Sequence, residues 1–321
     1  MNITPFEDRV RVAAALVDGV SIRAVARMTD IHRDTIRRFG VEAGEACTRL
    51  HDALVRDVQP TFIEADELWT FVHSKQGHLQ PGDPPEYGDQ YVFVGLDATT
   101  KLIISYAIGK RNGVTTDRFV ADLRQRVLGR PQISTDAFAP YPDAVMRHFA
   151  DVDFATIAKD YAAPVEAEAS RRYSPGRIRN VTKRVVCGAP RQDKISTSYI
   201  ERTNLSFRMH LRRFTRLTNG FSKKLRNLEA AVGLFVAWYN FCRVHETLRV
   251  TPAMESGLTD HVWTLAELLD TALYHCPTPP PAVPVELRGM SASEAKGGQR
   301  AVQPKRLTLI RGGRSSMRGV A

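Results

Sequence analysis

The order of the apolar segments between residues 61 and 158 constrains the fold of this chain more than any other feature. Three strand-like segments come first, joined by a polar Gly- and Pro-rich loop and then by a tight turn, at 61–72, 91–97 and 102–108. Helix-like and strand-like segments then alternate, at 117–128, 131–136, 141–149 and 153–158. This order predicts an α/β fold in which an antiparallel meander is extended by parallel strands, as in a ribonuclease H-like, retroviral-integrase-like mixed sheet with flanking helices.

An all-α module is predicted before the sheet, within residues 1–50. A first helix covers 6–17, Ser21 can cap a second helix, and a third helix starts near His32. This spacing is typical of a helix-turn-helix module that inserts its third helix into the major groove of DNA. The candidate DNA contacts on that helix are Arg33, Arg37 and Arg38. The alternative is a small helical bundle with a solvated charged face, since the module's net charge is only +1.

The remaining chain is divided by its composition. Residues 51–60 read as a linker, and 61–275 as one domain that ends in an apolar helix at 225–244 and a last helix at 263–274. A basic connector is expected at 171–194. Residues 276–321 are rich in Pro, Gly and Ser and predict a disordered basic tail.

Positive charge is concentrated in one segment. Residues 171–226 contain 16 Lys and Arg but only two acids, Asp193 and Glu201, whereas the whole chain has a net charge of +10. A polyanion such as double-stranded DNA is the expected partner of such a segment. We expect no membrane partner, because no apolar run is long enough to span a bilayer, and we expect an intracellular protein. The four cysteines form no CxxC pair, so neither a zinc site nor a disulfide framework is predicted.

Residues 195–214 predict a single helix that carries Glu201 among the basic residues. Apolar residues recur along it at helical spacing, and no Gly or Pro interrupts it. Candidate contacts to DNA phosphates follow on the same segment, at Asn204, Arg208, Arg212 and Arg213. For Asn204 and Arg208 the alternative is that they orient Glu201. A lone Glu in this setting is most simply a structural ion pair, and two aspartates elsewhere change that interpretation.

Asp66 lies in the first predicted strand, and Asp136 ends the fourth. These strands are neighbours in the predicted sheet, so Asp66 and Asp136 would lie side by side, with Glu201 above them on its helix. Three carboxylates in one crevice repel each other unless cations neutralise them, and hard oxygen ligands suit Mg²⁺ or Mn²⁺. Two such ions would support phosphodiester cleavage and transfer. Glu67 is expected on the opposite face of the strand, and Asp97 is interpreted as a turn former rather than a ligand.

Three motifs carry a resemblance to a known family. These are DELWTFV at Asp66, STDAFAPY at Asp136 and SYIERTNLSFR at Glu201, and a later WYNFCRVHETLRVTPAM begins at Trp238. Together they resemble the DDE transposases of bacterial insertion sequences, most closely the family named after insertion sequence one. The resemblance covers roughly residues 1–260.

This resemblance implies a metal-dependent DNA transposase. Asp66, Asp136 and Glu201 would be its catalytic and metal-binding residues, with two Mg²⁺ or Mn²⁺ ions. Its partners would be the element's terminal inverted repeats and target DNA, bound by a homo-oligomer that holds two ends. Two alternatives remain open from the sequence: a non-catalytic DNA-binding regulator that keeps the fold, and a nuclease that hydrolyses DNA without joining it.

Overall fold

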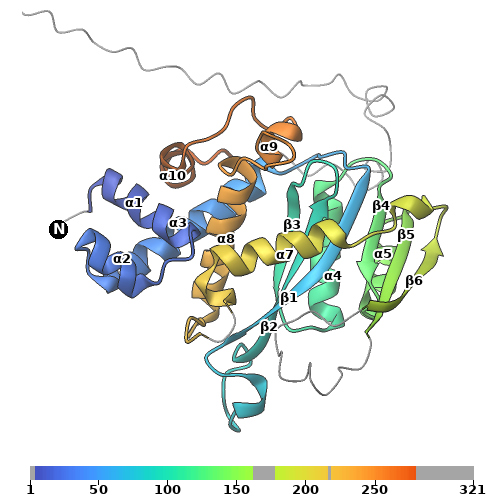
Figure 1. The fold of residues 1–321 in the computed structure, drawn as a ribbon, viewed down its shortest axis with the longest axis horizontal. Coiled ribbons are helices and arrows are strands. Elements are labelled where there is room, and N and C mark those ends of the chain that lie inside the picture. Colours follow the sequence, from blue (N-terminus) through green and yellow to red (C-terminus); the bar gives the residue numbers. More distant parts are fainter. Residues whose placement is uncertain (1–3, 162–177, 216–217, 280–321) are drawn as a thin grey trace, which may run out of the picture.

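The computed structural model describes residues 4–161, 178–215 and 218–279 (Figure 1). The predicted tail beyond residue 279 lies outside this part of the chain. Within it, no helix combines the length and the apolar character that crossing a bilayer requires.

The N-terminal region is helical, as expected from the sequence. It comprises α1 (Phe6–Val17), α2 (Ile22–Thr29) and α3 (Arg33–Leu54). The Ser21 hydroxyl caps α2 by accepting a hydrogen bond from the Ala24 N–H at 3.3 Å. The helix α3 passes through the predicted boundary at residue 50 without a break, and its C-terminal half packs against α8 (Leu225–Phe241).

A six-stranded mixed sheet forms the centre of the molecule, in the order β3-β2-β1-β4-β5-β6. Strands β1, β2 and β3 form the predicted antiparallel meander, and β4 and β5 extend it in parallel, so the expected ribonuclease H-like order is confirmed. The strand bounds are Phe62–Val72, Gly88–Asp97, Ile103–Gly109, Gln132–Asp136, Asp153–Tyr161 and Ile178–Cys187.

A sixth strand, which the sequence did not predict, lies within the basic connector expected at 171–194; residues 171–177 of that connector lie outside the described part of the chain. Strand β6 pairs antiparallel with β5 at the edge of the sheet. Its residues from Ile178 to Val185 are exposed, so the strand has no buried face and shows no alternation of apolar and polar residues. Alternation of apolar and polar residues is the sequence signal for a half-buried strand, so a strand that lacks it cannot be recognised from this pattern.

Helices cover both faces of the sheet (Figure 1). On one face, α7 (Ser198–His210) and α8 bury Leu68, Val92 and Val94. On the other face, α4 (Gly113–Arg126) and α5 (Pro140–His148) pack against residues such as Phe93 and Ile133. The short α9 (Pro252–Glu255) and the last helix α10 (Leu265–Tyr274) pack near α8, and α10 also contacts α3.

The helix predicted within 195–214 is confirmed at its start, because Thr197 is one of the residues expected to cap it, but it ends four residues before the predicted end. Helix α7 begins at Ser198 and ends at His210, and Leu211 adopts an extended backbone before a 3₁₀ turn, Arg212–Phe214. This break brings the Phe214 ring to 6.0 Å from the Phe207 ring. In a continuous helix, residues seven apart are separated by roughly 10 Å along the axis. Burial of both rings in one core cluster therefore explains the break.

Two glycines allow α3 and α8 to cross closely. A Cβ atom on Gly44 would lie 2.0 Å from the Ala230 carbonyl oxygen, and one on Gly233 would lie 2.7 Å from the Gly44 carbonyl oxygen. The backbones of the two helices are thus in direct contact, which joins the N-terminal helices to the domain that contains the sheet.

We expect Gly44→Ala to lower the free energy of unfolding by about 2 kcal/mol, because the added methyl group forces the two helix backbones apart. Urea unfolding measures this change. Gly113→Ala is the matched control, because no atom lies within 4 Å of the Cβ position on Gly113. Equal stability of the two variants would contradict the close crossing.

Candidate active site

Asp66 and Asp136 lie together, as the strand order predicted. β1 pairs in parallel with β4 through Ala65 and Thr135, so the next residue on each strand is an aspartate. Ligand oxygens of Asp66, Asp136 and Glu67 all lie within 4.8 Å of one another. These three residues, called the acidic cluster below, offer a metal ion hard oxygen ligands.

Glu67 is the member of the acidic cluster that sequence reasoning set aside. Leu68 packs with α7 and α8, whereas Ala65 packs with the α4–α5 side, so Glu67 points toward that second side. Strand β4 ends at Asp136 while β1 continues to Val72, and the Glu67 carboxylate therefore reaches Asp136 beyond the end of β4. Its Oε1 is buried without a hydrogen-bond partner among the described residues.

Arg111 neutralises part of this cluster. It lies between β3 and α4, where its Nε is 3.1 Å from Glu67 Oε2 and its Nη2 is 3.3 Å from Asp136 Oδ2. The guanidinium also stacks over the Phe138 ring, 3.9 Å from the ring centre. Arg111 thus provides a fixed positive charge at the mouth of the acidic cluster.

Helix α7 is held over β1 by a carboxylate from the sheet. Glu64 Oε2 accepts hydrogen bonds from the Tyr199 and Ile200 backbone N–H groups, at 2.8 and 2.9 Å. These N–H groups belong to the first turn of α7, where no intrahelical acceptor exists. A carboxylate is favoured there, because the helix dipole is positive at this end. The first N–H group of the helix, that of Ser198, donates to the Ser196 hydroxyl at 3.1 Å, whereas the N-cap residue Thr197 makes no side-chain bond to the helix backbone.

Asn204 connects α7 to the acidic cluster. Its Nδ2 donates a hydrogen bond to Asp66 Oδ2 at 2.8 Å, and the residue is buried. The sequence suggested that Asn204 contacts a DNA phosphate or orients Glu201. In the structure its amide group bonds Asp66, so the carboxylate that it orients is Asp66.

Glu201 lies near the acidic cluster but outside it. Its side chain is 48% exposed and forms an ion pair with Lys159 of β5. It also accepts a hydrogen bond from the Thr197 hydroxyl at 2.8 Å. The Glu201 charge is close enough to raise the pKa of Asp66, after the larger effect of burial.

Burial and mutual repulsion raise the pKa values of the acidic cluster. Burial, with the added charges of Asp136 and Glu201, raises the pKa of Asp66 to about 6. Burial and the charge of Asp136 raise the pKa of Glu67 to about 7. Burial also raises the pKa of Asp136, although Arg111 opposes this. These carboxylates therefore hold protons more tightly than exposed acids do, and a divalent cation would favour their ionised forms.

The other candidate residues lie away from this cluster. Arg33, Arg37 and Arg38 are exposed on α3, while Arg208, Arg212 and Arg213 lie at the end of α7 and in the turn that follows. Asp97 accepts hydrogen bonds from the Thr99 N–H and the Thr100 hydroxyl, both at 2.8 Å, which confirms its interpretation as a turn former.

Sequence reasoning missed Arg111 and Lys159, which pair with the acids of the site, and Glu64, whose carboxylate holds α7. Glu64 could have been found, because it lies two residues before Asp66 and so shares its face of the strand. No sequence pattern distinguishes Arg111 or Lys159 from the many other basic residues.

No protein-family model matches the chain, and no curated protein matches it. The chain is similar to the piggyBac transposase in its synaptic complex with hairpin DNA, with 10% identity, a TM-score of 0.38, and coverage of 95% of this chain and 75% of that one. It is also similar to a pre-cleavage Mos1 transpososome, with 11% identity, a TM-score of 0.20, and coverage of 48% of this chain and 60% of that one.

We expect the stability of the metal-free protein to depend on pH through Asp66. Its pKa is about 6 in the folded state, above the ordinary value of 3.8, so the folded protein binds this proton more tightly than the unfolded chain. The resulting stabilisation is present at low pH and is lost as the pH rises through about 6. Two pKa units correspond to roughly 3 kcal/mol at pH values well below 3.8, and roughly half of this stabilisation remains at pH 5.

Urea unfolding in EDTA, at about pH 5 and about pH 8, measures this dependence. The fall in the free energy of unfolding between these pH values should be smaller in Asp66→Asn than in the wild type. Glu42→Gln removes an exposed acid of α3 and should leave the fall unchanged. An unchanged fall in Asp66→Asn would show that Asp66 has no raised pKa.

Proposed function

We propose that this protein is a DDE-type DNA transposase that carries out divalent-metal-dependent DNA cleavage and strand transfer. The observation that carries the proposal is the convergence of Asp66 and Asp136 from neighbouring strands, with Glu201 on the helix that covers them. We also propose that the protein belongs to the bacterial insertion sequence family named after insertion sequence one, because its three sequence motifs resemble those of that family.

The residues at this site fit a divalent cation. The acidic cluster offers carboxylate oxygens that all lie within 4.8 Å of one another. We assign the metal-binding role to Asp66, Asp136 and Glu201, with Mg²⁺ or Mn²⁺ as the ion and two ions as the expected number. When bound, such ions would activate the attacking water or 3′-hydroxyl and stabilise the leaving oxygen of the cleaved phosphodiester.

The surrounding side chains would prepare the site for this chemistry. Asn204 holds Asp66 in one orientation through its amide N–H. Arg111 bonds one oxygen of Asp136 and one of Glu67. The other oxygen of Asp136 accepts a hydrogen bond from the Phe138 N–H at 3.0 Å, which fixes the orientation of this carboxylate. Lys159 would have to release Glu201 before that carboxylate could join the acidic cluster, and a DNA phosphate is the natural new partner for the released ammonium group.

Double-stranded DNA is the proposed partner. The exposed Arg33, Arg37 and Arg38 of α3 would contact the terminal inverted repeat, with the arginines after α7 on its phosphates. Because transfer of an element requires its two ends to be held together, we propose that the protein acts as a homo-oligomer on DNA.

The test is nicking of a labelled duplex derived from the DNA that flanks the reading frame, in Mg²⁺ and in Mn²⁺. Asp136→Asn and Glu201→Gln should each lower the nicking rate at least about a thousandfold and leave duplex binding within about twofold, since each removes a metal ligand without removing a contact to DNA. Glu255→Gln, which removes an exposed acid on α9, should keep full activity.

The outcomes separate the candidate functions. Tight binding of the duplex without nicking by the wild type would favour the non-catalytic DNA-binding regulator. If Glu201→Gln nicks DNA as fast as the wild type, Glu201 is not a metal ligand, and Asp66, Asp136 and Glu67 would be the ligands. Nicking without any joined product would favour the hydrolytic nuclease.

A further inference from the structure

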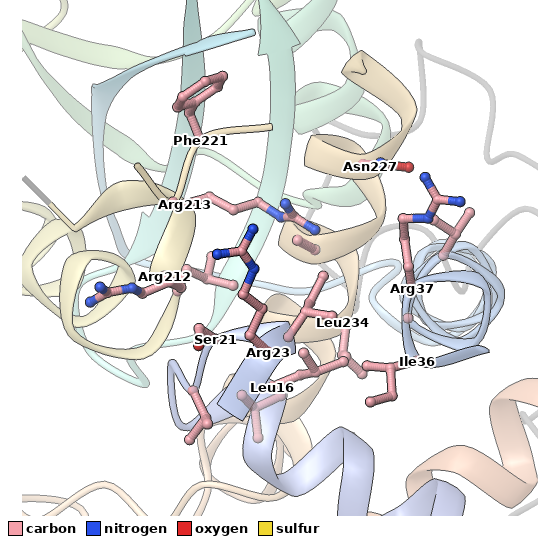
Figure 2. Close-up of a pocket in the computed structure, with 18 of the residues that line it drawn as sticks. Leu16, Ser21, Arg23, Ile36, Arg37, Arg212, Arg213, Phe221, Asn227 and Leu234 are labelled. Atoms are coloured by element: carbon pink, nitrogen blue, oxygen red, sulfur yellow. The ribbon is translucent and has the colours of Figure 1, made fainter. Parts of the chain in front are cut away.

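A cavity of about 520 Å³ lies between the N-terminal helices and the segment that follows α7 (Figure 2). The end of α1, the start of α2 and the middle of α3 form one side. The 3₁₀ turn Arg212–Phe214, the loop at 219–221 and one face of α8 form the other. Leu16, Ile36 and Leu234 provide an apolar floor.

The polar lining of this cavity is strongly basic. Arg23, Arg37, Arg212 and Arg213 line it, and no Asp or Glu is among its lining residues in the described part of the chain. Of these four, only Arg37 has an acidic partner among the described residues, Asp34 at 3.4 Å. Figure 2 shows the guanidinium groups of Arg23 and Arg213 turned into the cavity, while Arg212 points away from it.

Arg213 is the residue that most requires a ligand. Its guanidinium forms no hydrogen bond or ion pair with any residue that the structure describes, although it is enclosed between the two sides of the cavity. Burial lowers the pKa of Arg213 to about 10, and no acidic group opposes this shift. A buried charge without a partner destabilises a fold, so its presence in this position calls for a compensating anion.

The two sides of the cavity are held together by direct contacts. The Val17 carbonyl oxygen lies 3.2 Å from His210 Nδ1, close to the end of α7. A Cβ atom on Gly19 would lie 2.9 Å from the Met209 carbonyl oxygen, so the turn after α1 touches the same helix end. The arginines of both sides are therefore presented to one enclosed space.

We propose that this cavity binds a phosphate group through Arg213 and Arg23, and that the phosphate belongs to the backbone of duplex DNA. A guanidinium offers paired N–H donors that match two phosphate oxygens, and no acid lines the cavity in the described part of the chain to oppose the charges of Arg23 and Arg213. That DNA supplies the phosphate rests on the proposed function. The DNA would then run between the N-terminal helices and the turn after α7, rather than along the exposed face of α3 alone.

The first experiment compares stability with DNA binding in Arg213→Met. Removing the unpaired charge should raise the melting temperature of the free protein by a few degrees, because Met fills similar volume without a desolvated charge. The same variant should bind a short duplex of arbitrary sequence about tenfold more weakly. Across a salt series, the slope of log K against log salt should become shallower by about 1.

Two variants control for charge. Arg147→Met removes an arginine that pairs with Asp117 on the α4–α5 side of the sheet, and it should change neither the affinity nor the salt slope. Arg213→Lys keeps the charge without the paired donors, and it should recover the slope but only part of the affinity. Unchanged DNA affinity and slope in Arg213→Met would overturn DNA as the source of the phosphate.

The second experiment replaces DNA with inorganic pyrophosphate, against sodium chloride of equal ionic strength. A rise in melting temperature with wild type and none with Arg213→Met would establish a phosphate site that free anions also reach. If neither pyrophosphate nor DNA distinguishes the variant from the wild type, the site does not exist. Both assays measure binding, so failure to nick DNA would overturn the proposed function without touching this result.

Discussion

The arrangement of the candidate site depends on the bond between the Glu64 carboxylate and the first turn of α7. The side chain of the N-cap residue Thr197 makes no bond to the helix backbone, and a residue of β1 satisfies the first-turn N–H groups of Tyr199 and Ile200. That bond fixes where α7 starts and which side it turns to the sheet. Asn204 then reaches Asp66, and Glu201 comes close enough to influence the same carboxylate. The site is thus built from one strand and one helix that share a buried hydrogen-bonded contact.

The negative charge at the site is partly balanced within the protein itself. Two basic side chains from different parts of the sheet, Arg111 and Lys159, pair with Glu67, Asp136 and Glu201. Asp66 and Glu67 respond further by holding protons near neutral pH. Without these responses, several carboxylates in one crevice would repel each other strongly. A divalent metal ion that binds here would therefore displace protons and basic side chains from the carboxylates and neutralise them in their place.

The sequence predicted the central sheet because its strands have buried faces, and it predicted the pairing of Asp66 with Asp136 because strand order follows from element order. It failed where burial gives no periodic signal. Strand β6 is exposed along most of its length, so its residues resemble those of a loop. The break at Leu211 depends on how Phe214 packs against Phe207, which only the three-dimensional core decides. Arg111 and Lys159 reach the acids across the sheet from distant segments, and spacing along the chain does not reveal such contacts.

The continuity of α3 has a mechanical consequence. Its first turns carry the arginines that we propose contact DNA, and its later turns cross α8 at Gly44 with the two backbones in contact. A helix of this length, 22 residues, spans roughly 33 Å and bends little along its axis. No break in α3 separates the proposed DNA contacts from the part that packs against α8. The first turns of the helix therefore keep a constant position relative to the sheet. The distance between the arginines that would hold DNA and the acidic cluster that would cut it is therefore set by the protein and stays constant.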